Sequence, residues 1–358
     1  MKKINVLIVG SDSSVKGGIT TVINQYLNKK FGNVKMDHLP TYIEGNNIIK
    51  ILFFLKSYFK YIKKIISNEF DIVHIHMSYK GSFYRKLLIV LVSKLFNKKI
   101  VIHLHGSEFK VFYYSSNKLI KKFIKFLIRS SDAFLVLGDN WEKVIKEIEP
   151  DSKTFVLRNS ISIPDSKVNL NEEEFNILFL GVLIKRKGIY DLIDAIKLLD
   201  DKDYIKKYNM KFIIGGIGKE QDKLEEIIKN KKLGYCINMA GWVDGLKKEE
   251  LLKKSQLFVL PSYNEGLPMA ILEAMSHGIP TISTKVGSID EVVKSEENGY
   301  LIKPRDIDSL ANSILDMAKD KEKWKKFSEN SRNIIIKEFD EKNYFNYIEK
   351  VYFEILKN

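Results

Sequence analysis

Short apolar runs alternate with amphipathic stretches along most of the chain. In runs such as residues 4–9, nearly every position is apolar, which is typical of a strand buried on both faces of a parallel sheet. The stretches between the runs repeat apolar residues at helical spacing. This alternation predicts parallel α/β layers. The expected strands are 4–9, 72–75, 100–104, 133–137, 155–157, 177–180, 212–214, 257–260 and 281–283.

The alternation stops once and then restarts. Residues 162–176 are polar and lack periodicity, and a new strand at 177–180 follows and ends at Gly181. We therefore expect a domain boundary within 165–172 and two Rossmann-like domains in tandem. In such domains ligands bind at the carboxyl ends of the strands. The loops that follow the strands are accordingly where functional residues are expected.

The basic charge of the chain is confined to its first half. The 358 residues carry a net charge of +14, and residues 1–170 contribute +15 while residues 171–358 contribute −1. This asymmetry predicts a local anionic partner: nucleic acid, a membrane surface or a phosphorylated small molecule. The apolar runs 51–55 and 87–92 are too short to span a bilayer. Cys236 is the single cysteine, so no internal disulfide is expected, which favours a reducing cytosolic setting.

Two glutamates lie eight residues apart after the strand at 257–260. Glu265 is expected in the loop and Glu273 two turns into the following helix. The N–H groups at the helix start, at Gly266 and Leu267, suit a phosphate group. The carboxylates are up to about 12 Å apart along such a helix, too far to share one proton or metal. They can hold two hydroxylated parts of one long ligand, although an ordinary helix start with an acidic residue is the simpler alternative.

The segment 261–280, PSYNEGLPMAILEAMSHGIP, resembles the E-x7-E signature of retaining glycosyltransferases of family 4, which have the GT-B fold. Its pieces P-S, E-G, E-A-M and G-x-P occur in the family's order, and residues 286–314 are similar to the family's closing region. The resemblance implies two Rossmann-like domains that face each other across a cleft. Residues 1–168 would bind the acceptor and residues 169–342 the nucleotide sugar, with a C-terminal helix, 343–358, joining the first domain.

The resemblance also implies roles for the two glutamates and for a basic turn. Glu265 would hydrogen-bond hydroxyls of the donor sugar, and Glu273 would hold the ribose. Arg186 and Lys187 follow the strand that ends at Gly181, and fixed cations there would stabilise a departing diphosphate without a metal. The family typically has an arginine directly after this glycine, where this chain has Val182. A solvated basic turn is the alternative.

A glycine pair follows the first strand. Gly17 and Gly18 open a helix, and paired glycines allow a ligand to approach the backbone closely. The spacing matches neither G-x-G-x-x-G nor a Walker motif, and a plain turn is the alternative. In the family that the chain resembles, a glycine pair here borders the donor phosphate and the acceptor.

Four histidines lie on two of the expected strands or directly after them. His105 resembles the family histidine that contacts the donor sugar near the reacting carbon. For His74, His76 and His103 a zinc site is the alternative to structural burial. We expect no metal, because alternating histidines on a strand are taken to point to opposite faces, no cysteine is close in sequence and no H-E-x-x-H motif occurs.

Two stretches of the first half, 48–66 and 118–129, combine lysines with aromatic and aliphatic residues at helical spacing. Each is either an ordinary surface helix or a helix that lies on an anionic membrane. The basic positions are Lys56, Lys60, Lys63, Lys64, Lys118, Lys121, Lys122, Lys125 and Arg129.

The sequence thus predicts a retaining glycosyltransferase of the hexosyltransferase type. The expected donor is a UDP- or GDP-linked sugar, used as a substrate without cofactor or metal. The expected acceptor is a lipid-linked saccharide of surface polysaccharide biosynthesis, reached from the cytoplasm at the inner face of the cell membrane. One alternative is a GT-B sugar-nucleotide epimerase. Another is a basic nucleic-acid-binding protein, which no zinc-finger or RNA-recognition motif supports, so nucleic acid is not an expected partner.

Overall fold

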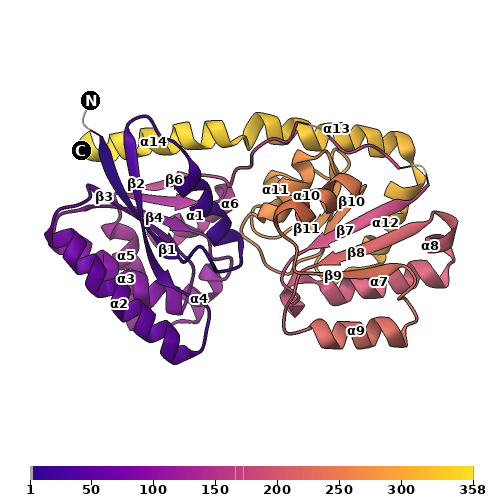
Figure 1. Ribbon diagram of the computed structural model, residues 1–358, viewed down its shortest axis with the longest axis horizontal. Coiled ribbons are helices and arrows are strands. Elements are labelled where there is room, and N and C mark those ends of the chain that lie inside the picture. The colour runs from indigo at the N-terminus through magenta and orange to yellow at the C-terminus, as the bar shows by residue number, and fades with distance from the viewer. Residues whose placement is uncertain (1–2, 166, 172, 358) are drawn as a thin grey trace. The chain divides into compact units, whose positions relative to one another are not determined.

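The computed structural model describes residues 3–165, 167–171 and 173–357 (Figure 1). Positions 1, 2, 166, 172 and 358 of the predicted domain ranges lie outside them. The chain forms two compact units. Unit 1 comprises Met1–Asn159 and Tyr344–Asn358, and unit 2 comprises Ser160–Asn343. The division thus falls at 159/160, whereas the sequence predicts a boundary after residue 168.

Unit 1 is built on a six-stranded sheet in the order β2-β1-β3-β4-β5-β6. All five strand pairs are parallel. The strands β3, β4 and β5 are buried along nearly their whole length, which explains why most of their residues are apolar. The strands are β1 (Ile4–Ser11), β2 (Val34–Tyr42), β3 (Ile72–Met77), β4 (Lys99–Leu104), β5 (Ala133–Val136) and β6 (Thr154–Val156).

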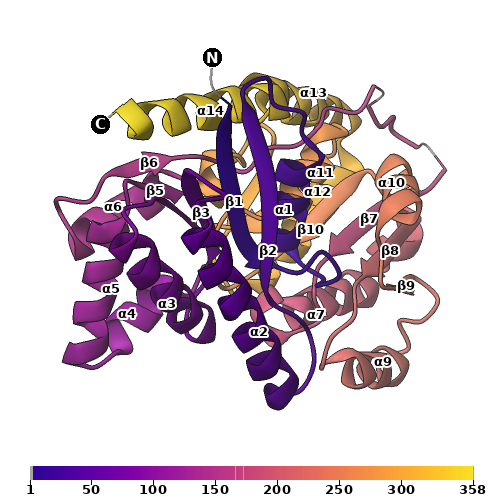
Figure 2. The same ribbon diagram turned by 60° about the vertical axis from the view of Figure 1, so that its left-hand side comes forward.

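Helices cover both faces of this sheet (Figures 1 and 2). One face packs on α2 to α6 through a single apolar core that includes Tyr61, Phe83 and Phe109. Asparagine side chains cap α2 and α5, since Asn46 and Asn117 each accept from the backbone N–H three residues on, at 2.9 Å. The helices are α1 (Gly18–Asn28), α2 (Asn47–Ile66), α3 (Gly81–Leu95), α4 (Phe109–Ser115), α5 (Lys118–Ser130), α6 (Asp139–Ile148) and α14 (Glu341–Lys357).

The opposite face of the sheet carries a cluster of histidines among its buried aliphatic residues. Tyr26 of α1 and Tyr352 of α14 are fully buried against His74 of β3. The Tyr352 hydroxyl lies 2.5 Å from Nδ1 of His74, and the Tyr26 and Tyr344 hydroxyls are 2.8 Å apart. These contacts hold the end of α14 on unit 1, which accounts for the grouping of residues 344–357 with residues 3–159.

Unit 2 repeats the architecture with a second six-stranded sheet in the order β12-β11-β10-β7-β8-β9. All five pairs are again parallel. The strands are β7 (Phe175–Leu180), β8 (Met210–Gly215), β9 (Ile237–Gly241), β10 (Leu257–Leu260), β11 (Thr281–Thr284) and β12 (Gly299–Ile302). The helices are η1 (Lys185–Lys187), α7 (Ile189–Asp201), α8 (Tyr204–Lys207), α9 (Gln221–Asn230), α10 (Gly245–Lys254), α11 (Met269–Ser276), η2 (Ile289–Glu291), α12 (Ile307–Lys319) and α13 (Lys321–Glu338).

The predicted α/β class is confirmed, and each of the nine expected strands corresponds to an observed one within three residues at either end. Three strands, β2, β9 and β12, were missed. All three lie at an edge of their sheet. An edge strand needs fewer apolar residues, and β2 accordingly alternates between buried and exposed positions and contains Pro40.

The hydropathy of the helices indicates whether any of them could span a membrane. Among the residues that the structure describes, no helix is long and apolar enough to cross a bilayer.

The hydrogen bond of Tyr352 tests how firmly α14 holds unit 1. We expect Tyr352→Phe to lower the free energy of unfolding by about 1–3 kcal/mol, because it leaves a buried ring nitrogen of His74 without its partner. Tyr347→Phe, on the same helix with the ring 39% exposed, is the matched control and should stay within about 0.5 kcal/mol of the wild type. Urea unfolding followed by circular dichroism measures both. Equal stability of the two variants would contradict the assigned contact.

Candidate functional site

Two loops of unit 2 meet at the carboxyl ends of adjacent strands. The strand order places β10 beside β7, where the order of the sheet reverses, and such a position is the usual ligand site of an open α/β sheet. Gly188, after β7, has φ of 68°, and a Cβ there would lie 1.9 Å from the carbonyl oxygen of Pro261. Only glycine fits this approach. The basic turn η1 therefore lies directly against the loop that follows β10.

An ion pair joins these two loops. Lys187 Nζ lies 2.6 Å from Oε1 of Glu265, and the side chains are only 16% and 8% exposed. Two charges so far from water are stable only when they are paired closely. Two residues that the sequence singles out from motifs 78 positions apart are thus in direct contact. The pair presents a carboxylate and an ammonium group side by side.

Arg186 also binds the loop after β10. Its Nη1 donates to the carbonyl oxygen of Asn264 at 2.6 Å, and its own carbonyl accepts from the N–H of Tyr263 at 2.8 Å. Part of the guanidinium's hydrogen-bonding capacity is therefore used within the protein. Val182, where the resembled family has an arginine, is 41% exposed.

The segment Glu265–Leu267 is held on its other side by the loop after β11. The Ser288 N–H donates to the carbonyl of Gly266 at 2.9 Å. Gly287 has φ of 61°, and a Cβ there would lie 2.1 Å from the carbonyl oxygen of Glu265. Leu267 is buried. Three loops thus fix the position of the Glu265 backbone.

Glu273, on α11, has a partner of its own. Its Oε1 lies 2.7 Å from Nζ of Lys248 on α10. Each of the two signature glutamates is thus paired with a different lysine. Sequence reasoning missed Lys248, because it belongs to a run of charged residues, 247–250, in which no feature distinguishes it from the neighbouring lysine.

The glycine pair lies in unit 1 at the carboxyl end of β1. Gly17 precedes α1 with φ of 145°, and Gly18 is the first residue of that helix. Both are exposed, and a Cβ on Gly17 would meet no atom within 4 Å. The backbone here is open to solvent, as an approach by a ligand requires.

His105 directly follows β4 and is partly buried. Its ring stacks on that of His76 at 5.1 Å between centroids, and its Nε2 lies 2.9 Å from Nδ1 of His76. Removal from water lowers the pKa of His105 to about 3. The imidazole is therefore neutral near pH 7 and can offer a hydrogen bond, not a charge.

The expectation that the strand histidines point to opposite faces is wrong. Residues two apart on a strand share a face, and the structure stacks His74 on His76 and brings His103 beside them. Ring nitrogens of the three lie within 4.8 Å of one another, so their geometry could accommodate a metal ion. Burial lowers the pKa of all three, which keeps them neutral. The expected absence of a metal remains a prediction.

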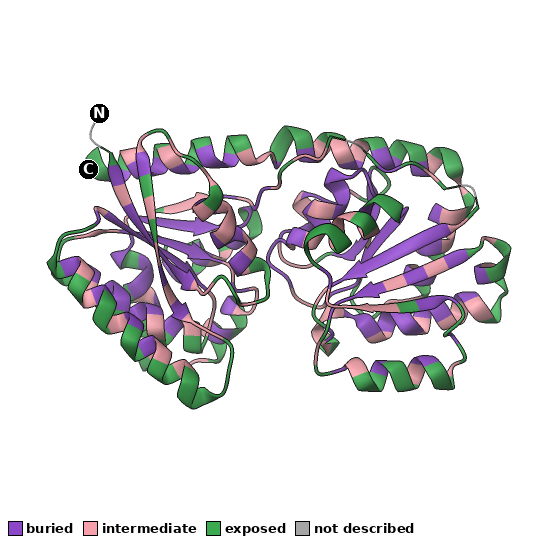
Figure 3. Ribbon diagram, in the orientation of Figure 1, coloured by how far each residue is buried: buried purple, intermediate pink, exposed green. Residues whose placement is uncertain are grey.

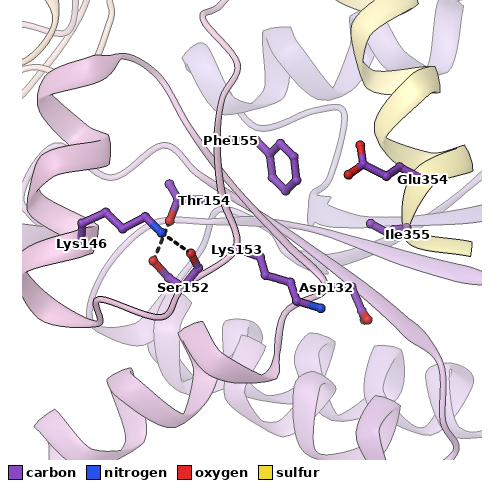
Figure 4. A pocket seen from close by; sticks show the side chains of 8 residues that line it. All are labelled: Asp132, Lys146, Ser152, Lys153, Thr154, Phe155, Glu354 and Ile355. Carbon is purple, nitrogen blue, oxygen red and sulfur yellow. Dashed lines mark hydrogen bonds between the residues drawn. The ribbon is translucent and has the colours of Figure 1, made fainter. Parts of the chain in front are cut away.

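Two cavities lie in unit 1. One, of about 330 Å³, lies at the amino ends of β5 and β6, opposite the end where Rossmann-like sheets bind ligands (Figure 4). Its Lys146 ammonium already donates to the carbonyl oxygens of Pro150 and Ser152. The other, of about 180 Å³, lies at the carboxyl ends of β1 and β3 and includes Arg85 and Lys86. Sequence reasoning missed these two residues, because they precede the apolar run 87–92 and read as ordinary surface positions of a helix.

Comparisons with known proteins agree with this architecture. The structure superposes on sucrose-phosphate synthase from Thermosynechococcus elongatus with a TM-score of 0.82, covering 99% of this chain and all of that chain at 16% identity. It superposes on HepE of Anabaena in complex with UDP with a TM-score of 0.78, covering 98% and 100% at 17% identity. These likenesses show the GT-B fold.

Sequence comparisons define the class of enzyme. Residues 162–334 match the family model described as "Glycosyl transferases group 1". An Escherichia coli protein named UDP-Gal:alpha-D-GlcNAc-diphosphoundecaprenol alpha-1,3-galactosyltransferase is 28% identical, over 91% of this chain and 85% of its own length. N-acetyl-alpha-D-glucosaminyl L-malate synthase of Bacillus anthracis is 24% identical, over 81% and 76%. The protein is a GT-B glycosyltransferase, and the residues that match the group 1 model make up most of unit 2.

The histidine face predicts how stability depends on pH. Folding holds the pKa values of His74 and His105 at about 3, against 6.5 for free histidine, and lowers those of His76 and His103 as well. Below pH 6.5 the unfolded chain therefore binds more protons than the folded one. The free energy of unfolding is therefore highest above pH 6.5. It decreases as the pH falls toward 3, by about 1.4 kcal/mol per pH unit for each histidine.

A variant isolates one of the four groups. Within the described part of the chain, neither ring nitrogen of His103 has a hydrogen-bond partner, so His103→Leu removes a titrating site without breaking a hydrogen bond. We expect the variant to lose less stability than the wild type between pH 7.5 and 5.0 in urea unfolding. Identical pH slopes would show that His103 is protonated equally in both states.

Proposed function

We propose that the protein is a retaining glycosyltransferase of family 4 that transfers a hexose from a UDP- or GDP-linked donor to an acceptor hydroxyl. The observation that carries this proposal is the Lys187–Glu265 pair at the point where the sheet of unit 2 reverses its order. Binding of a nucleotide sugar requires a cation beside the diphosphate and a hydrogen-bond acceptor beside the sugar hydroxyls. Here the two groups are 2.6 Å apart.

The geometry supports a division of roles within unit 2, the nucleotide-sugar-binding unit. Lys187, with Arg186, stabilises the charge that develops on the departing diphosphate. The carboxylate of Glu265 accepts hydrogen bonds from the sugar. Glu273, in the helix α11 that follows, holds the ribose. The N–H groups of Gly266 and Leu267, before α11, face the phosphates.

Unit 1 supplies the acceptor side of the reaction. Neutral His105 orients the sugar by a hydrogen bond, and Gly17 and Gly18 border the donor phosphate and the acceptor. With retention of configuration, the acceptor hydroxyl attacks the face that the diphosphate leaves, and a phosphate oxygen takes the hydroxyl proton. The protein's cations then do the work of a divalent metal, so neither a metal nor a cofactor is required.

We propose a lipid-linked saccharide of surface polysaccharide biosynthesis as the acceptor. The names of the relatives support this choice: the Escherichia coli enzyme acts on a diphosphoundecaprenol-linked sugar, and other relatives are named as putative colanic acid and teichuronic acid biosynthesis glycosyltransferases. These relatives match this chain at 26–28% identity.

We propose further that unit 1 binds peripherally to the anionic inner face of the cell membrane, from the cytoplasm. While α2 packs on the sheet through Phe54, Tyr61 and Ile65, it exposes a second apolar stripe (Figure 3). This stripe consists of Ile48, Leu52, Leu55, Phe59 and Ile66. The exposed lysines Lys56, Lys60 and Lys63 flank it, whereas Lys64 is already paired with Asp37 and Glu69. Apolar side chains framed by lysines suit an anionic lipid surface.

Substitution of the ion pair tests the proposed chemistry. We expect Glu265→Gln and Lys187→Met each to lower kcat by about 100- to 1,000-fold, since each removes a group that contacts the sugar or the leaving diphosphate. Turnover of UDP- and GDP-sugars, by transfer to an acceptor or by hydrolysis, is measured by nucleoside diphosphate release.

Lys185→Met is the matched control, because Lys185 lies in the same turn with its side chain exposed. Its turnover should match that of the wild type, and wild-type turnover should persist in EDTA. Full activity of both site variants would refute the assignment, and loss of activity in EDTA would refute the role of the cations. Conversion of the donor into a different nucleotide sugar, without any acceptor, would identify an epimerase instead.

Vesicle binding tests the membrane surface. We expect Leu52→Glu combined with Phe59→Glu to weaken binding to phosphatidylglycerol-containing vesicles at low salt by at least about tenfold, through lost apolar contact and added repulsion. Leu246→Glu, at a position 89% exposed in unit 2, is the control and should bind as the wild type does. Co-sedimentation measures the bound fraction. Equal binding by all proteins, or no binding by the wild type, would overturn this part of the proposal.

A further inference from the structure

The smaller cavity of unit 1 is an anion site by its composition. It lies at the carboxyl ends of β1 and β3, where the strand order β2-β1-β3 reverses, and it has a volume of about 180 Å³. The helix α3 begins beside it, with no acidic residue in its first turn. Among the described residues, the lining includes two cations and several hydroxyl groups but no carboxylate. Its polar residues include Ser11, Tyr42, Ser78, Ser82, Arg85 and Lys86.

Lys86 is the most informative of these residues. Its side chain is 2% exposed, and its Nζ donates to the hydroxyl of Thr41. Among the described residues, no acidic side chain forms an ion pair with it. A buried ammonium group without a counter-charge is costly. Burial and repulsion from Arg85 accordingly lower the pKa of Lys86 well below its usual value. An anion in the cavity supplies the missing charge.

Arg85 contributes a second cation to the same space. Its guanidinium lies over the ring of Tyr42 at 5.1 Å, which fixes its plane. Its Nε is buried and has no hydrogen-bond acceptor within the described structure. A planar guanidinium with an unused donor beside an ammonium group matches the geometry of a phosphate.

The chemistry along α3 indicates what carries the anion. Beyond Lys86 the helix exposes an apolar stripe, Leu88, Leu91 and Leu95, and it packs beside α2 with its own exposed stripe. An anion site at the start of a helix that also exposes apolar residues suits a phosphate attached to a lipid. The donor diphosphate has its own cations in unit 2, Arg186 and Lys187, so Lys86 and Arg85 are available for a different phosphate.

We infer that Lys86 and Arg85 bind the phosphate or diphosphate group of a lipid-linked acceptor in this cavity. The inference rests on the proposed transfer to such an acceptor. Lys86 and Arg85 then position the acceptor through its phosphate and take no part in the chemical step.

Thermal-shift titration of the full chain with inorganic pyrophosphate and with farnesyl diphosphate, in saturating UDP or GDP, tests the site. The nucleotide occupies the donor site first, so a further shift reports a second anion site. We expect Lys86→Met to weaken pyrophosphate binding by about 10- to 100-fold, the loss of one charge-assisted hydrogen bond, and Arg85→Gln to weaken it as well. Lys94→Met, exposed on the same helix, should behave as the wild type does.

Three further readouts separate the outcomes. Without ligand, Lys86→Met should be at least as stable as the wild type, because the Thr41 hydroxyl still donates to Gly10 O at 3.0 Å and a buried charge is gone. A purely structural Lys86 predicts a large loss of stability instead. The nucleotide shift should be equal in all variants, and its loss in Lys86→Met would place Lys86 in the donor site and overturn the inference. Farnesyl diphosphate should bind more tightly than pyrophosphate, and the reverse order would refute a lipid-linked ligand.

Failure of the proposed function has a different signature. If no UDP or GDP shift occurs even in the wild type, the donor assignment is wrong, while loss of the pyrophosphate shift in Lys86→Met still supports an anion site. Pyrophosphate shifts of equal size in the wild type, Lys86→Met and Arg85→Gln overturn the anion site, whatever the nucleotide result.

Discussion

The contact between two backbones at Gly188 is the constraint on which the site of unit 2 depends. Because β7 and β10 are neighbours in a parallel sheet, the segments that leave their carboxyl ends run side by side, and Gly188 lets them touch. As a result, Lys187 lies beside Glu265, and the Arg186 guanidinium donates to the carbonyl of Asn264. The Glu265 side chain is held by Lys187, and its backbone is held by the Ser288 N–H, which donates to the carbonyl of the next residue, Gly266. Rigid support of this kind lets charged groups act on a ligand without first reorganising.

Interior strands and loop motifs were visible in the sequence because each has a local signature. Predominantly apolar runs marked β3, β4, β7 and β10, and glycine, proline and glutamate at fixed spacing marked the loop before α11. The edge strand β2 escaped notice because it alternates between buried and exposed positions. That pattern does not explain β12, whose four residues are mostly buried. The pattern of apolar residues in the sequence indicates directly which strands are buried. It indicates only indirectly where each strand lies in its sheet.

The residues that sequence reasoning missed are those whose meaning depends on a partner far away in the chain. Lys248 matters because Glu273 lies beside it, and Lys86 matters because no acidic side chain among the described residues forms an ion pair with it. Neither relation has a sequence signal, since lysines abound in both regions. The histidine error had a different origin: the period of a strand is two residues, so His74 and His76 share one face. That face combines stacked neutral rings with tyrosine hydroxyls from α1 and α14, a polar core that needs its covering helices more than an aliphatic one does.

The placement of α14 has a consequence for how the chain acquires its structure during synthesis. Unit 2 is continuous in sequence, whereas unit 1 is split, and the helix that covers its histidine face is made after all of unit 2. Domains fold as they emerge from the ribosome, N-terminal first. Unit 1 is synthesised first, but its fold cannot be completed until α14 has been made. Until then, His74, Tyr26 and their neighbours are uncovered. The second unit has all its strands and can be complete first, so the order of completion along this chain is the reverse of the order of synthesis.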